Sequence, residues 1–110
     1  YETELAAVDG LGLSEVEMEL VIMLVTGFVK GIVGGLHEKV AEEQASGLTE
    51  EQWWAATEPH LDRVYDPERY PTATRIGPVS GPELGAYPAD RAYAFGLERL
   101  LDGVAVLVER

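Results

Sequence analysis

Few residues in this chain have the types and spacing that chemistry needs, and His37 is the first to consider. His37 and Glu38 begin the His-Glu-x-x-His pattern, in which two histidines one helical turn apart bind zinc and the glutamate acts as a base. Position 41 is Ala, where the second histidine would stand. The other histidine is His60, and the chain has no cysteine. Because one imidazole is not a metal site, we predict no metal and no cofactor.

Nucleophilic and acid–base catalysis find no better support. The serines are Ser14, Ser46 and Ser80; none follows a strand in the strand–turn–helix elbow that exposes a catalytic serine. Adjacent carboxylates occur at positions 42–43 and 50–51, where helix ends are expected, and such pairs are usually solvated. We therefore predict that the chain is not an enzyme.

The adjacent tryptophans Trp53 and Trp54 are the clearest candidates for binding a small molecule. Each brings a large apolar surface and one N–H donor, the combination that ligand pockets favour. We nominate both for ligand binding together with His60, and with Met23 and Phe28 from the preceding helical stretch. The alternative stays open that these aromatic residues only cover the core or the edge of a dimer, as aromatic residues at helical spacing usually do.

The element that must position these residues is the stretch from Ser14 to Ser46, which reads as one long helix. At about 100° per residue its large apolar side chains fall on one broad arc, which comprises Met18, Val21, Ile22, Val25, Phe28, Val29, Ile32, Leu36 and Val40. A second arc carries glycines, at positions 27, 31, 34 and 35. A helix that is apolar almost all round is buried on two sides. We predict that one side meets the core of this chain and the other meets a second copy.

The last helical stretch, from Pro88 to about Glu109, repeats this design, with Gly96 and Gly103 seven residues apart on one flank. Two such helices from each of two subunits would form a four-helix seam at crossing angles of roughly 20°. The fold class that we predict is an all-α helical bundle, with one domain over residues 1–110. The proposed dimer interface consists of Gly27, Gly31, Gly35, Leu97, Leu100, Leu101, Gly103, Val104 and Leu107.

In the remaining segments, capping residues, prolines and glycines predict where helices begin and end. Residues 1–9 read as the last turns of a helix, and residues 49–52 (Thr-Glu-Glu-Gln) form a capping box for the next helix. Pro59 is expected to kink or restart that helix. Asp66-Pro67 predicts a short helix to about Arg75. Residues 77–88 contain several Gly and Pro, which predicts a mobile loop rather than an element.

Composition excludes some partners and leaves one alternative. The net charge is −12, from 20 acidic and 8 basic residues, so this segment lacks the clustered Lys and Arg that contact phosphates in nucleic acid. Leu20 to Leu36 is close to the roughly 20 residues that span a membrane, and its glycines repeat a spacing known from membrane helix pairs. Lys30 near the middle and the absence of a basic flank argue against insertion. We predict no membrane association.

Two segments carry a resemblance to a known family. Residues 66–71 (Asp-Pro-Glu-Arg-Tyr-Pro) and 95–104 (Phe-Gly-Leu-Glu-Arg-Leu-Leu-Asp-Gly-Val) resemble the C-terminal domain of TetR-type (tetracycline repressor-like) transcriptional regulators. The Gly-Leu-Ser entry at 12–14 into a long glycine-bearing helix is similar too. The resemblance covers most of the chain from Gly12 onward, and the string that begins at Phe95 is its most specific part.

This resemblance implies a cytoplasmic homodimer that binds a small-molecule effector, which we expect to be apolar or aromatic. Family members read operator DNA through an N-terminal helix-turn-helix domain, which is absent from these residues. The resemblance further implies a repressor that leaves DNA when the effector binds. The magnesium-coordinating histidine of tetracycline-type sites lies upstream, so no metal site is carried over. The alternative function is a helical homodimerisation module without a ligand.

Overall fold

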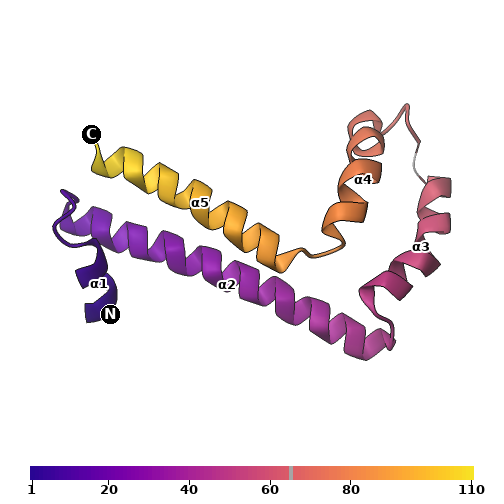
Figure 1. Ribbon diagram of the computed structural model, residues 1–110, viewed down its shortest axis with the longest axis horizontal. Helices are drawn as coiled ribbons and strands as arrows, with labels where there is room; N and C mark the ends of the chain where they lie inside the picture. Colours follow the sequence, from indigo (N-terminus) through magenta and orange to yellow (C-terminus); the bar gives the residue numbers. More distant parts are fainter. Residues whose placement is uncertain (65) are drawn as a thin grey trace. The chain divides into compact units, whose positions relative to one another are not determined.

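The computed structural model describes residues 1–64 and 66–110, with the backbone alone for residues 62–64. The described chain is helical throughout and contains no β-strand, which confirms the all-α prediction (Figure 1). The helices are α1 (Glu2–Val8), α2 (Glu15–Ser46), α3 (Glu50–Val64), α4 (Pro71–Leu84) and α5 (Ala89–Val108). They form two compact units. We call residues 1–34 with 89–110 the seam unit, and residues 35–88 the elbow unit.

In the seam unit, α5 runs antiparallel to the first half of α2 (Figure 1). At one end the Arg110 guanidinium holds both carboxylate oxygens of Glu17 at 2.7 Å. Further along, the ring of Phe28 stacks on Tyr93, with centroids 6.0 Å apart. The same Phe28 ring covers Gly96, so that a Cβ at this glycine would collide with it. The absence of a side chain at Gly96 lets the two helices approach at this point.

The start of α2 is fixed by a reciprocal cap. The backbone N–H of Ser14 donates to the Glu17 carboxylate at 2.8 Å, and the Glu17 N–H donates to the Ser14 hydroxyl oxygen at 3.2 Å. This arrangement is the capping box, which satisfies two of the N–H groups that a helix start leaves free. The predicted start of the long helix at Ser14 is confirmed.

Many apolar side chains of the seam unit remain exposed to solvent. Val21 is the one buried hydrophobic residue in the described chain. The large apolar residues of α2 and α5 that stay exposed in this unit are Val16, Leu20, Met23, Leu24, Val29, Val33, Tyr93, Phe95, Leu101 and Val106. Among the described helices, α2 alone is long and apolar enough to cross a membrane, and only 6% of its most apolar window is buried within the chain. The chain thus leaves an apolar surface much larger than its own packing covers.

In the elbow unit, α2 ends where the sequence predicts. Gly47 has φ +70°, which an L side chain rarely adopts, and its N–H donates to the Glu43 carbonyl at 2.9 Å. The predicted capping box of α3 is present, because the Thr49 N–H donates to Gln52 and the Gln52 N–H donates back to the Thr49 hydroxyl. The helix continues through Pro59 without restarting.

The predictions for residues 67–88 are wrong in two respects. The helix begins at Pro71 rather than Pro67, because the Glu68 N–H donates to the Asp66 carboxylate at 3.0 Å and closes a turn instead. The helix then continues to Leu84, through the segment that was expected to be a loop. Gly85, with φ +71°, ends it by donating its N–H to the Gly81 carbonyl.

The spacing of the prolines explains why α4 stays helical although it contains them. Pro71 stands at the first turn, where a missing N–H costs nothing. Pro78 and Pro82 follow at intervals of seven and four residues, so that all three lie on one stripe of the helix, and all are exposed. The carbonyl groups that lose their N–H partners therefore lie on one side of α4, so hydrogen bonds on its other sides can hold the helix together.

Candidate functional site

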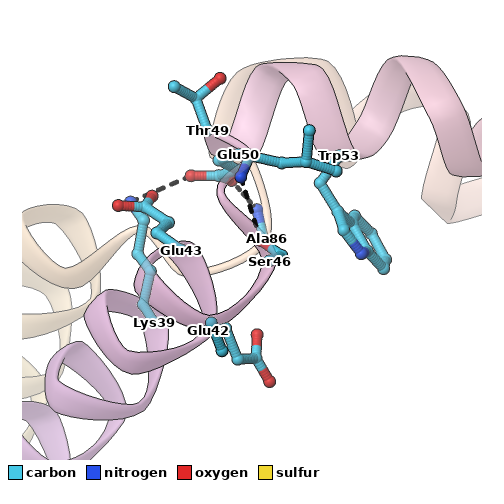
Figure 2. Close-up of a pocket in the computed structure, with 10 residues that line it drawn as sticks. Lys39, Glu42, Glu43, Ser46, Thr49, Glu50, Trp53 and Ala86 are labelled. Carbon is cyan, nitrogen blue, oxygen red and sulfur yellow. Dashed lines mark hydrogen bonds and ion pairs between the residues drawn. The ribbon is translucent and has the colours of Figure 1, made fainter.

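The candidate site is built around Glu50, the first residue of α3. Its carboxylate accepts the backbone N–H of Ala86 and forms an ion pair with the Lys39 ammonium at 3.0 Å (Figure 2). The Thr49–Gln52 cap fixes the start of α3 and with it the direction of this side chain. Glu50 thereby joins the end of α2, the start of α3 and the segment that follows α4.

Both charges of this pair are stabilised by their surroundings. The Ala86 N–H and, after it, the Lys39 ammonium lower the pKa of Glu50 below its usual value. The hydrogen bond to Glu50 in turn raises the pKa of Lys39. The pair therefore stays ionised around neutral pH, and much of the positive charge of Lys39 is neutralised within the chain.

An open pocket of about 490 Å³ lies at this elbow. Glu42 and Glu43 contribute carboxylates from α2, and Trp53 contributes its indole ring from α3. In Figure 2 the Trp53 ring lies beside Ser46 and Ala86, and the Glu42 side chain lies below them. The full lining comprises Lys39, Glu42, Glu43, Ala45, Ser46, Leu48, Thr49, Glu50, Trp53 and Ala86. The pocket thus combines an aromatic surface with negative charge.

The predicted ligand-binding residues are divided between the two units. Trp53 lines the pocket, and Trp54 meets it edge-on with ring centroids 5.3 Å apart. The indole N–H of Trp54 is buried and has no hydrogen-bond partner among the residues that the structure describes. His60 is exposed on α3. Met23, 65% exposed, and Phe28, stacked on Tyr93, belong to the seam unit.

The pocket also contains residues that the sequence did not single out for a ligand. The sequence predicts Glu42 and Glu43 as solvated carboxylates near a helix end and Glu50 as part of a cap, and it gives Lys39 no role. Ala86 comes 36 residues after Glu50, and no local pattern joins them. One sequence signal could have pointed to the pocket. Lys39, Glu42 and Glu43 are three and four residues apart and so share a helix face, and a tryptophan pair follows in the next helix.

The residues predicted for a dimer interface fall into two groups. An added Cβ at three of the glycines would meet no atom within 4 Å: Gly27, Gly31 and Gly103. Gly35 differs, because the ring of Tyr87 covers it within the elbow unit. Leu101 is half exposed, whereas four predicted contacts are already half-buried within the chain: Leu97, Leu100, Val104 and Leu107. Their place between two subunits remains a prediction.

Among the residues that the structure describes, no three His, Cys, Asp or Glu side chains gather in a way that could hold a metal ion. The Lys39 ammonium at the elbow forms its ion pair with Glu50.

Comparison with known proteins places this chain in a family. A family model described as "Tetracyclin repressor-like, C-terminal domain" matches residues 1–108. The chain belongs to this tetracyclin repressor-like family. It is also 31% identical over 108 residues to the HTH-type transcriptional repressor DrrR1 of Streptomyces coeruleorubidus, a match that covers 97% of this chain and 38% of that protein. No solved structure matches the chain.

Family membership confirms the resemblance that residues 66–71 and 95–104 carry. It also confirms that the chain is not an enzyme, since domains of this family are non-enzymatic parts of transcriptional regulators. C-terminal domains of the family generally dimerise and bind effectors.

Proposed function

We propose that this chain is the effector-binding and dimerisation domain of a TetR-type repressor, which leaves its operator when a small molecule binds. The supporting observation is the solvent-open apolar surface of the seam unit, where Val21 is the one buried hydrophobic residue that the structure describes. DNA contact is assigned to a helix-turn-helix domain outside this chain, because the chain itself carries a net charge of −12. Such a regulator acts inside the cell, which agrees with the expected cytoplasmic location.

The helical spacing of the seam unit supports a specific dimer face. On α2, Gly27 and Gly31 lie on one exposed stripe with Leu20 and Met23. Since α5 is antiparallel to α2, Gly103 falls on the same side of the helix pair. Open glycines between exposed apolar residues allow the backbones of two subunits to approach closely. We assign this glycine face to the second copy.

The opposite flank of the pair is also apolar and carries Val29, Val33 and Leu101. The chain spans 38% of the length of DrrR1. We assign this second flank to residues of the full-length protein that lie outside the chain. The two flanks together account for an α2 that is apolar on two sides without placing it in a membrane.

The elbow pocket provides the ligand side of the proposal, with Trp53 as its aromatic wall. An effector can shift a two-state equilibrium only if it binds one state better than the other. We propose that an effector favours the dimer geometry in which the two DNA-binding domains no longer match the operator. The rigid α2–α5 pair would transmit this change.

The test uses the full-length protein, a DNA duplex selected from a random library, and a panel of aromatic and apolar compounds. Sedimentation should show a dimer, and DNA anisotropy should show release by a compound that also quenches Trp fluorescence. A dimer that no compound binds or releases would instead indicate the homodimerisation module without a ligand. A monomer at high concentration would overturn both functions.

A further inference from the structure

The elbow pocket has an uneven charge balance. Its lining contains three carboxylates, of Glu42, Glu43 and Glu50, against one ammonium, of Lys39. Lys39 is engaged by Glu50 at 3.0 Å, and Glu50 is further neutralised by the Ala86 N–H. Glu43 also stabilises the charge of the Lys39 ammonium electrostatically, whereas Glu42 forms no ion pair within the part of the chain that the structure describes. The pocket therefore has an excess of negative charge that the chain does not compensate.

The same pocket has an aromatic surface. Trp53 lines the pocket and is 43% exposed, because its ring is held edge-on by Trp54 with an interplanar angle of 84° instead of being covered. The face of an indole ring attracts cations through its quadrupole, and tryptophan does so better than other aromatic residues. A molecule between this ring and the carboxylates thus meets an apolar surface on one side and negative charge on the other.

We propose that the elbow pocket binds an organic cation with an aromatic or apolar body, the body against Trp53 and the charged group toward Glu42 and Glu43. The inference rests on the proposed function and defines its effector more closely than an apolar or aromatic molecule. An anion would face the same carboxylates at an electrostatic cost. A neutral molecule of equal shape would gain the aromatic contact alone.

The test measures binding of three probes of matched shape to the full-length protein by calorimetry at pH 8. N-methyl-4-phenylpyridinium carries a positive charge, 4-phenylpyridine is neutral, and biphenyl-4-carboxylate is negative. One carboxylate near a cation in a solvent-exposed site contributes roughly a factor of five to ten in affinity. The cation should therefore bind about tenfold or more tightly than the neutral probe, and the anion should bind weakest. Added salt should reduce this preference.

Variants assign the preference to the pocket. The double variant Glu42→Gln/Glu43→Gln should reduce the preference for the cation to less than about twofold, while binding of the neutral probe stays unchanged. Glu51→Gln is the matched control, because Glu51 is an exposed carboxylate of the same helix start that does not line the pocket, and it should behave as wild type. Trp53→Leu should weaken both probes.

Equal affinity for the cation and the neutral probe would overturn this inference, and so would a preference that survives the double variant or no binding of any probe. The proposed function is judged separately, by dimerisation and by release of DNA with the wider compound panel. If a neutral compound released DNA and quenched Trp fluorescence, the proposed function would stand and the cationic effector would not.

Discussion

The seam unit and the elbow unit differ in what holds them together. In the seam unit, α2 and α5 meet through apolar and aromatic contacts, and the Glu17–Arg110 ion pair joins their ends. In the elbow unit, the carboxylate of Glu50 joins three segments by an ion pair and a backbone hydrogen bond. One unit leaves apolar surface open, and the other leaves a charged pocket open.

This difference separates the two tasks proposed for the chain. Apolar surface is stabilised when protein covers it, without need of a particular donor or acceptor, so the seam unit suits a constant partner such as a second copy. Polar contacts are directional and fix the positions of few atoms, so the elbow unit suits recognition of a small molecule. If the distinction holds, substitutions in each unit should affect different measurements.

The largest effect is expected from Gly31→Leu in the seam unit. A Cβ at this position meets no atom of the chain, so the fold of each subunit should persist. Between subunits, overpacking costs about 1–3 kcal/mol, and in a symmetric dimer each substitution acts twice. We expect the dimer dissociation constant to rise by about a hundredfold or more, measured by sedimentation.

Gly77→Leu is the matched control, because Gly77 is an open helical glycine of the elbow unit. It should leave dimerisation unchanged. Unaltered dimerisation of Gly31→Leu would remove the glycine face from the proposed interface and, with it, the assignment of self-association to the seam unit.

Glu50→Ala should have the next largest effect and should be confined to the elbow unit. The substitution leaves the Ala86 N–H without its acceptor and Lys39 without its ion pair. Losing such a partner costs about 1–2 kcal/mol. We expect faster hydrogen exchange at the Ala86 amide and a lower melting temperature, while the dimer dissociation constant stays unchanged. Glu51→Ala, which removes an exposed carboxylate one residue further on, should have neither effect. A rise in the dimer dissociation constant with Glu50→Ala would contradict the separation of tasks.

A smaller effect on stability is expected when two helical glycines are each replaced by alanine. Gly96→Ala places a methyl group against the Phe28 ring, whereas Gly77→Ala meets open space. Alanine gains up to about 1 kcal/mol over glycine in a helix, so Gly77→Ala should be stabilising. At Gly96 this gain is offset by displacement of Phe28 from its stack on Tyr93. Chemical denaturation should show Gly96→Ala less stable than Gly77→Ala by about 1 kcal/mol; equal stabilities would mean that Phe28 moves freely.

The sequence predicted those parts of the fold that local signals determine. The ends of α2 and the start of α3 are set by Ser14, Gly47 and Thr49, each of which acts on backbone groups within four residues. The extent of α4 was not predicted, because each proline and glycine by itself argues against a helix. The helix is tolerated because its prolines lie on one stripe. The Ser14–Glu17 capping box follows the same four-residue pattern as the predicted Thr49–Gln52 box.

The candidate site was predicted less completely, for a physical reason. Trp53 was found because a large aromatic residue is conspicuous by type. Lys39, Glu50 and Ala86 matter only through contacts between distant segments, and Glu50 and Ala86 are 36 residues apart. Sequence periodicity predicts which residues share a face of one helix. It does not predict which helix faces come into contact across a turn such as Gly47–Thr49.

The smallest expected effect concerns the ion pair that closes the seam unit. The hydrogen bond from Arg110 and the cap at Ser14 lower the pKa of Glu17 from 4.5 to about 2. Because this pKa is lower in the folded chain, the contribution of Glu17 to stability is present above about pH 4.5 and is lost as the pH falls toward 2. The melting temperature of wild type should therefore exceed that of Glu17→Gln at pH 6, and the difference should shrink steadily below pH 4.5. Glu15→Gln, in the same helical turn, serves as the control and should lack this convergence. A wild-type advantage over Glu17→Gln that persists at pH 2 would show that the α2–α5 pair depends on the size and hydrogen bonding of this side chain rather than on its charge.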